Sequence, residues 1–170
     1  MKSYFKVALR NLAGVAFFVA ISLNLLAQSN FAGNWALNET KSNFGNSQFR
    51  MAATSMVVTQ DAKVLNVEST QPGRDGGEMK RSAKYNLDGS VSENPMFGDN
   101  MSKSTATWSA DKTVLTIVTT MTFEMNGESR TMNSSQIWKL AEGGKVLLVE
   151  NKRTNRDGAE MSTTAAYDKK

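Results

Sequence analysis

Arginines that alternate with large apolar residues are the most chemically informative feature of this sequence. Arg81 alternates with Met79 and Tyr85, and Arg130 lies an even number of residues before Trp138. Successive side chains of a β-strand point to opposite faces, so each arginine is predicted to share a face with its apolar neighbours. A guanidinium on an apolar face is costly unless an anion pairs with it or water reaches it. The pattern therefore indicates a site that clamps the anionic head group of a small molecule, such as a carboxylate.

Arg153 belongs to the same set if a loop at 156–158 closes a hairpin, because it then shares a face with Met161. These faces also carry methionines, which adapt to irregular ligands. An alternative stays open: each arginine lies near a strand end, reaches water along its alkyl stem, or pairs with Glu68 or Glu150. Under the first interpretation the predicted ligand-binding residues are Met79, Arg81, Tyr85, Met121, Phe123, Arg130, Trp138 and Arg153.

Catalytic and metal-dependent chemistry is poorly represented in this chain. The sequence has no histidine and no cysteine, which removes the commonest general base, the commonest metal ligand and the thiol nucleophile. The acidic residues lie mostly at predicted turns or on outward faces without calcium-loop spacing, and no Gly-x-Ser-x-Gly sequence is present. We therefore predict that the protein is not an enzyme and that it uses no metal or cofactor.

The elements that must position these residues are predicted to be β-strands. After Ala27 the apolar residues follow no helical period, and short alternating runs are separated by turn dipeptides such as Asn-Gly at 126–127. One short strand is expected near Val91. The nine substantial strands are predicted at 31–38, 54–60, 63–70, 77–87, 102–109, 113–125, 128–140, 145–154 and 159–167.

A meander of this kind leaves unpaired strand edges, which closure into a barrel removes. We predict an all-β fold, in which an antiparallel up-and-down meander of about 8–10 strands closes into a barrel. An open meander folded into a sandwich is the alternative. The long runs 113–125 and 128–140 suit the tilted strands of a barrel that is large enough to hold a cavity.

A hairpin unit is repeated within the chain. Residues 63–85 and 145–167 align without a gap at an offset of 82, with 12 of 23 positions identical. Both copies contain Arg-Asp-Gly between their two strands, ending at Gly76 and Gly158. Glycine adopts the left-handed conformation that such hairpin loops require, so a structural role is predicted for both glycines. Duplication within one barrel explains the match better than convergence of two similar hairpins.

The first 27 residues have the order of a secretory signal peptide, with Lys2, Lys6 and Arg10 followed by an apolar run at 12–26. We predict cleavage after Ala27, a single domain at 28–170, and a location in the periplasm or outside the cell. An uncleaved anchor is the alternative. Removing 1–27 lowers the formal net charge from +4 to +1, with 17 basic and 16 acidic residues. That balance gives no support for binding nucleic acid or for stable membrane insertion.

Gly-Asn-Trp at 33–35 resembles the opening Gly-x-Trp motif of the lipocalin superfamily. The wider stretch 31–44, together with 85–89 and 138–140, resembles lipocalin-like domain proteins exported by bacteria. The resemblance implies a lipocalin-like barrel, a structural role for Gly33 and Trp35 at its floor, and a small apolar or amphipathic ligand. The chain departs from lipocalins because it has no Thr-Asp-Tyr motif and no evident helix after the last strand.

Two classes of function are therefore predicted. The first is an exported binding protein for a small apolar or amphipathic molecule, anionic molecules included. The second is a non-enzymatic structural or interaction barrel with a filled core in the cell envelope. The interior separates them, because a cavity with inward arginines favours binding and a solid core of methionine and tryptophan favours the alternative.

Overall fold

The computed structural model describes residues 28–45, 52–73, 76–96, 100–125, 127–154 and 159–170. The predicted signal peptide and Gly158 lie outside the described residues. Strands form at every position where the sequence predicted one. They are β1 (Gly33–Asn43), β2 (Ser55–Gln60), β3 (Val64–Pro72), β4 (Glu78–Asn86), β5 (Ser92–Pro95), β6 (Met101–Trp108), β7 (Val114–Met125), β8 (Glu128–Ala141), β9 (Val146–Thr154) and β10 (Glu160–Lys169).

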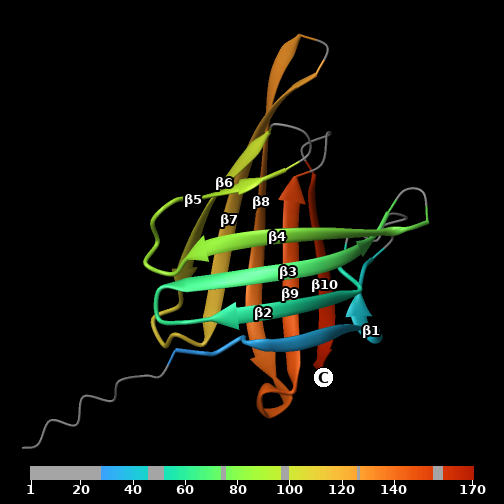
Figure 1. Ribbon diagram of the computed structural model, residues 1–170, viewed down its shortest axis with the longest axis vertical. Coiled ribbons are helices and arrows are strands. Elements are labelled where there is room, and N and C mark those ends of the chain that lie inside the picture. The colour runs from blue at the N-terminus through green and yellow to red at the C-terminus, as the bar shows by residue number, and fades with distance from the viewer. Residues whose placement is uncertain (1–27, 46–51, 74–75, 97–99, 126, 155–158) are drawn as a thin grey trace, which may run out of the picture.

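The strands form one antiparallel sheet with the order β4-β3-β2-β1-β10-β9-β8-β7-β6-β5. Consecutive strands are neighbours as in a meander, except that β4 and β5 lie at the two edges of the sheet and the first strand, β1, pairs with the last, β10. Figure 1 shows β2, β3 and β4 crossing in front of β7, β8, β9 and β10 at a steep angle, so the sheet curls around an interior. The predicted all-β barrel is confirmed. Within the described ranges, no helix has the length and the apolar character that crossing a membrane requires.

The first strand is longer than its sequence pattern predicts, because β1 continues past Asn38 to Asn43. Its pairing with β10 shifts register between these two residues. Within the irregular part, the Ser42 hydroxyl donates to the Asn38 carbonyl (2.6 Å) and accepts from the Ala166 N–H (2.9 Å). A side-chain hydroxyl thus replaces a ladder bond, which an alternating apolar pattern does not reveal.

The barrel closes between β4 and β5 through side chains, and we call this contact the seam. The Lys84 N–H donates to Asn94 Oδ1 (2.7 Å), and Asn94 Nδ2 donates to the Lys84 carbonyl (3.0 Å). The Asn86 N–H donates to Ser92 Oγ (2.7 Å). Asn94 and Ser92 are each 6% exposed. A carboxamide offers the same donor and acceptor as a peptide group, so Asn94 takes the place of a neighbouring backbone.

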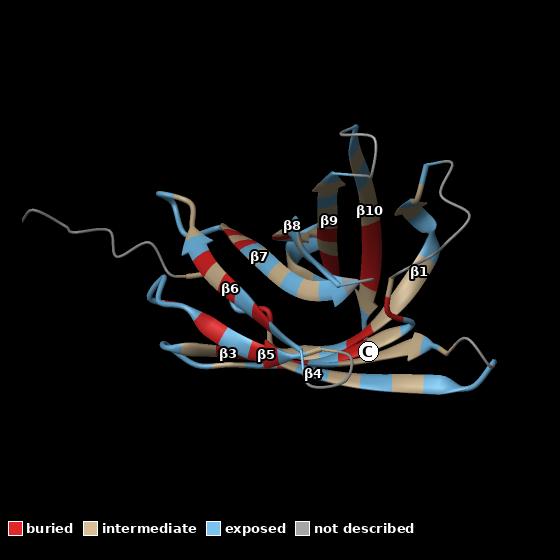
Figure 2. Ribbon diagram, turned by 90° about the horizontal axis from the view of Figure 1, so that it is seen from above, coloured by how far each residue is buried: buried red, intermediate tan, exposed pale blue. Residues whose placement is uncertain are grey.

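Aromatic side chains close one end of the barrel. The Phe31 ring is fully buried, stacks on Trp108 at a centroid distance of 5.6 Å and meets Trp138 edge-on at 5.7 Å. Trp35 is 1% exposed, and its Nε1–H donates to the Phe31 carbonyl (2.9 Å). Figure 2 shows buried residues as bands along β6, β9 and β10. The side chains at this end form the hydrophobic core, and the open interior of the barrel lies next to them.

Two glycines that the sequence singled out have positive φ angles. Gly76, in the β3–β4 loop, has φ of 81°, and open space surrounds the position where a Cβ would stand. Gly33 has φ of 149°, and a Cβ there would lie 2.8 Å from Lys169 Cε. The Lys169 ammonium in turn lies 5.3 Å from the Trp35 ring centroid. Gly33 therefore leaves room for a lysine that covers the tryptophan.

Candidate ligand-binding cavity

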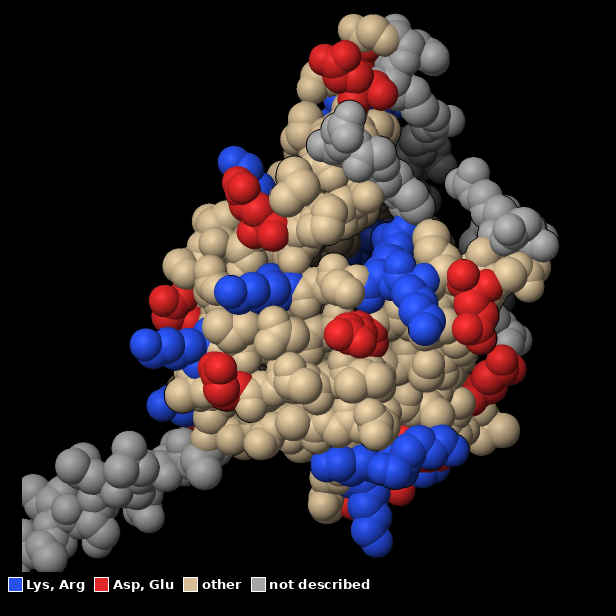
Figure 3. All heavy atoms as spheres, viewed as in Figure 1, with Lys and Arg blue, Asp and Glu red and all other residues tan. Residues whose placement is uncertain are grey.

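A cavity of about 340 Å³ occupies the barrel above the aromatic end. This volume lies near the lower limit of small-molecule pockets, which span roughly 300–1,000 Å³. Figure 3 shows a hollow on one face of the molecule with basic side chains beside it. The interior is therefore neither filled by side chains nor sealed from solvent.

The wall formed by β6 to β10 is arranged in rows, because antiparallel pairing places inward side chains of neighbouring strands side by side. The row next to the aromatic end is apolar and includes Leu115, Trp138 and Val149. The next two rows are largely polar. Their polar members are Gln136, Asn151 and Thr163 in the first and Ser104, Thr119, Ser134 and Arg153 in the second. We call the six uncharged polar residues of these two rows the polar belt.

The opposite side of the cavity, formed by β2, β3 and β4, carries both apolar and polar side chains. We call its apolar part the apolar wall, which consists of Met56, Val67, Ala83 and Tyr85. The other lining residues from these strands are Ser69, Gln71, Arg81 and Ser82. Burial raises the pKa of the Tyr85 hydroxyl. Desolvation likewise raises the pKa of Tyr167, which also lines the cavity, to about 12. Both phenols are therefore neutral at physiological pH and offer hydroxyl groups without charge.

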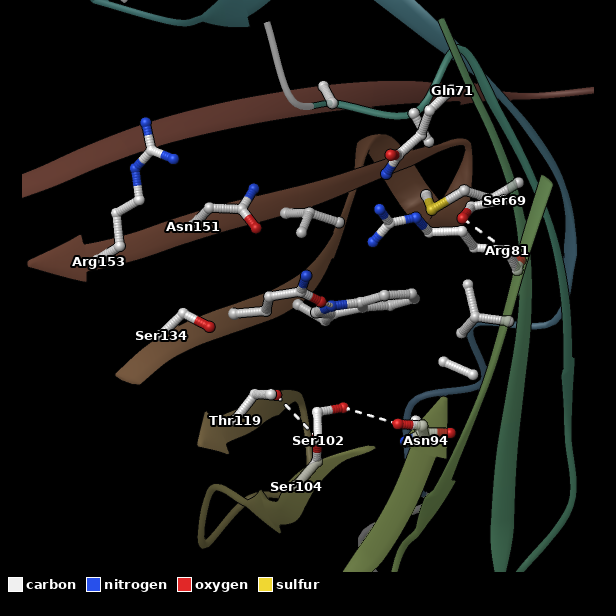
Figure 4. Close-up of a pocket in the computed structure, with 18 of the residues that line it drawn as sticks. Ser69, Gln71, Arg81, Asn94, Ser102, Ser104, Thr119, Ser134, Asn151 and Arg153 are labelled. Carbon is white, nitrogen blue, oxygen red and sulfur yellow. Dashed lines mark hydrogen bonds between the residues drawn. The ribbon is translucent and has the colours of Figure 1, made fainter. Parts of the chain in front are cut away.

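The charge in the cavity has a single sign among the lining residues that the structure describes. Arg81 and Arg153 line it from inward faces, Lys152 lines its edge, and no acidic side chain contributes. Lys152 is bound to Glu150, with 3.3 Å between Nζ and Oε1. Figure 4 shows the two guanidinium groups on opposite sides of the cavity, with Asn151 between them. The charged side chains among the described lining residues are thus all basic.

Five of the predicted ligand-binding residues meet in this cavity, namely Arg81, Tyr85, Met121, Trp138 and Arg153. They come from strands β4, β7, β8 and β9, which are far apart in the sequence. Alternation and the hairpin register therefore place them on the inner face as expected. The proximity of Arg81 to the polar belt could not be derived from any single strand.

The structure does not bring Arg130, Phe123 and Met79 to the cavity lining. Arg130 and Phe123 pair with each other beyond Met121. In this part β7 and β8 extend past the last residues that pair with β6 and β9, so the two strands pair only with each other. Figure 1 shows this hairpin projecting from the barrel. The Arg130 guanidinium instead contacts Glu128, at 3.3 Å. Met79 lies near the end of the β3–β4 hairpin, beyond the last β3 residue that pairs with β2. Side-chain alternation predicts which face of a strand a residue lies on. Whether that face lines the cavity depends on how far the neighbouring strands extend.

The polar belt is the part of the site that sequence reasoning missed. The inward positions of Ser134 and Gln136 followed from alternation, as did that of Asn151. Each alone is an ordinary polar strand residue, and only the register of β6 to β10 assembles them into adjacent rows. A run of hydroxyl and amide residues at inward positions of successive strands is the signal that could have found it. No cluster of carboxylate, histidine or cysteine ligands for a metal ion occurs in the described part of the chain.

Comparison with known proteins places the fold. No family model matches the sequence, and no curated protein sequence matches it. Among solved structures, zebrafish ileal bile acid-binding protein complexed with cholic acid matches with a TM-score of 0.53 and 13% identity, covering 84% of this chain and 100% of that one. Lobster apocrustacyanin A1 gives a TM-score of 0.38 and 12% identity, covering 82% of this chain and 61% of that one. The first match and the ten-stranded antiparallel sheet together identify the fold of this chain as a lipocalin-like β-barrel.

Proposed function

We propose that this protein binds a small amphipathic molecule inside the barrel and that arginine side chains hold its anionic group. The observation that carries the proposal is the lining of the cavity. Arg81 and Arg153 line it from opposite sides, and no acidic side chain lines it within the described residues. A carboxylate or sulfate between guanidinium groups forms strong charge-assisted hydrogen bonds, whereas a cationic ligand would be repelled.

The cavity also argues against the alternative of a structural barrel with a filled core. A filled core would place large apolar side chains where Asn151, Thr163 and Ser134 stand. Polar side chains around an open volume of about 340 Å³ contribute little packing energy, so stability alone does not explain them. The zebrafish structure, which shares the fold, was solved with cholic acid, an amphipathic carboxylate. That complex supports a carboxylate ligand as a reasonable choice for the first test.

The experiment compares dodecanoic acid with dodecanol by calorimetric titration of wild-type protein and of Arg81→Met. Methionine keeps a similar length and removes the charge. A hydrogen bond to a charged partner contributes roughly 1.5–3 kcal/mol, so wild type should prefer the acid by about tenfold or more. Arg81→Met should lose that preference. Lys80→Met is the matched control, because Lys80 lies next to Arg81 on β4 and is exposed outside the cavity.

Equal affinities for acid and alcohol in all three proteins would overturn the anion site. Acid preference that survives Arg81→Met but disappears in Lys80→Met would also contradict it, since the charge responsible would then lie outside the barrel. Circular dichroism and a denaturant melt of each variant separate loss of binding from loss of fold.

The proposal includes export to the periplasm or the medium, with cleavage near Ala27. Its support is the sequence of residues 1–27, in which basic residues precede an apolar run and small residues follow. A binding protein outside the cytoplasm would meet its ligand before uptake or after release. N-terminal sequencing of protein recovered from the cell envelope and the medium tests this directly. An N-terminus near Gln28 is expected, and an intact Met1 on exported protein would contradict cleavage.

A further inference from the structure

The polar belt contains hydrogen-bonding groups that have no partner among the side chains the structure describes. Ser104 and Thr119 hydroxyls bond each other at 2.8 Å, and Gln136 Oε1 accepts from Trp138 Nε1–H at 3.0 Å. The side chains of Asn151, Ser134 and Thr163 make no hydrogen bond within the described residues, and neither does the Gln136 amide nitrogen. Figure 4 shows Asn151 and Ser134 facing the cavity.

These groups lie opposite the apolar wall of Met56, Val67, Ala83 and Tyr85. The cavity therefore offers a ligand both an apolar surface and hydrogen-bonding groups, to which Ser69 and Gln71 of β3 also contribute. Arg81 and Arg153 add positive charge on its two sides. A ligand that satisfies this lining has an apolar body, several hydrogen-bonding groups and an anionic group.

An unbranched hydrocarbon chain matches only part of this lining. Where it lies against the polar belt, it displaces water from amide and hydroxyl groups and returns no hydrogen bond. Each such group then carries a desolvation penalty of roughly 1–3 kcal/mol. Hydroxyl groups on the ligand remove that penalty. A barrel lined only with hydrocarbon would behave in the opposite way, because adding hydroxyls to a ligand weakens its transfer from water.

We propose that the ligand class is a hydroxylated amphipathic carboxylate, in which several hydroxyl groups contact the polar belt. This inference rests on the proposed function and narrows it, since the arginines supply affinity for the anion and the polar belt selects the hydroxylated body. Asn151 is the central specificity residue, because its amide offers two donors and an acceptor in the row between Gln136 and Thr163.

The test uses two pairs of carboxylates that share a carbon skeleton and differ in hydroxyl number. The rigid pair is cholate, with three hydroxyls, and lithocholate, with one. The flexible pair is 9,10,16-trihydroxyhexadecanoate and hexadecanoate. Affinities are measured by displacement of a fluorescent probe at low micromolar concentrations. We expect the trihydroxy acid to bind about tenfold or more tightly in at least one pair, which reverses the order that hydrophobicity alone gives.

Asn151→Leu should abolish or reverse this preference, because leucine has a similar size and offers no hydrogen bond. Asn133→Leu is the matched control. Asn133 lies on β8 with its side chain exposed, and it bonds Thr120 Oγ1 on the outer surface at 2.9 Å. The control should keep the wild-type order of affinities. If Asn151→Leu unfolds the protein, Thr163→Val makes the same test with a smaller change.

Lithocholate and hexadecanoate binding as tightly as, or more tightly than, their hydroxylated partners would overturn the inference, and so would a preference that both Asn151→Leu and Thr163→Val leave intact. Failure to bind either hydroxylated acid would overturn it as well. The proposed function fails separately, through equal binding of dodecanoic acid and dodecanol. A protein that prefers dodecanoic acid but not hydroxylated acids is an anion-binding barrel whose polar belt holds only water.

Discussion

The hairpins β3–β4 and β9–β10 are built from the two copies of the repeated sequence, and they pair in the same register. Leu65 lies opposite Tyr85 in the first, and Leu147 lies opposite Tyr167 in the second, which preserves the offset of 82 residues. Both leucines are fully buried at 0% exposure. Equivalent sequence thus forms an equivalent hairpin, because alternation and turn length set the register locally.

The two hairpins differ in what lies beside their last strand. In the second copy, β10 pairs with β1 through a backbone ladder that includes Trp35 opposite Lys169. In the first copy, β4 faces the seam, where Asn94 and Ser92 bond its backbone through their side chains. The sequence of a hairpin therefore determines how its own two strands pair, but it does not determine which strand lies beside the hairpin. The seam is the place where the barrel depends on a few side chains rather than on a continuous ladder.

The copies also place their arginines differently. Arg81 occupies the position that Thr163 has in the second hairpin, and Arg153 occupies the position that Gln71 has in the first. Each hairpin therefore contributes one guanidinium to the described cavity lining, from non-equivalent positions. The two guanidinium groups lie on opposite sides of the cavity (Figure 4).

The largest expected effect tests whether the two buried leucines are equivalent. Leu65→Ala and Leu147→Ala should each lower the free energy of unfolding by about 2–5 kcal/mol, because each leaves a cavity in a fully buried site. Urea melts of the two variants should agree within about 1 kcal/mol if the hairpins are packed alike. Val57→Ala, at a side chain that is 47% exposed, is the control and should cost far less. A large cost at one leucine only would break the comparison.

The next effect concerns the seam. Asn94→Ala removes both bonds to the Lys84 backbone and should cost about 1–3 kcal/mol, because it leaves a strand-edge donor and acceptor without partners. Amide hydrogen exchange at Lys84 should accelerate, while amides of β10 that pair with β1 keep their protection. Asn66→Ala is the control, since it removes only an exposed bond to Thr59. Unchanged exchange at Lys84 would show that the backbone across the seam does not need Asn94.

A smaller effect is expected at the loops within the two hairpins. Gly76→Ala should cost about 1 kcal/mol, because alanine is strained at a φ of 81° although no atom stands in its way. Gly158→Ala should cost the same if the second loop has the conformation that the repeat predicts. Thermal or denaturant melts decide. A neutral substitution at Gly158 would show that the shared Arg-Asp-Gly sequence forms two different loops.

The smallest effect is a difference in acid sensitivity between the turns that precede the hairpins. The Asp61 carboxylate accepts the N–H groups of Lys63 and Val64, which holds the pKa of Asp61 below its ordinary value of 3.8. Its contribution to stability is present above that value and is lost as pH falls through the lower folded pKa. The equivalent turn uses Gly143 and Gly144 at φ of 65° and 87° and has no carboxylate at the position of Asp61.

Asp61→Asn keeps an acceptor oxygen and removes the titration, so melts below about pH 4 should show a shallower loss of stability than wild type. Gly144→Ala should destabilise the second turn equally at pH 3 and pH 7. An unchanged pH profile in Asp61→Asn would mean that the other turn carboxylates, Asp88 and Asp111, account for the acid sensitivity.

Much of the fold followed from the sequence because its elements are local. Hairpin signals such as Asn-Gly at 126–127 and alternation around Arg81 identified the strands and their inner faces. The exception in β1 arose where Ser42 replaced a ladder bond with its hydroxyl, since the pairing partner of Ser42 is more than a hundred residues away.

The sequence by itself determined which residues point inward, because side-chain alternation is a property of one strand. Only the tertiary structure decided which inward residues enclose a volume. Arg130 faces inward on a strand that outruns its neighbours, whereas Asn151 lies in a row that four other strands complete. A cavity exists where strands from distant parts of the chain reach the same height, and that height depends on strand lengths, barrel stagger and the seam together.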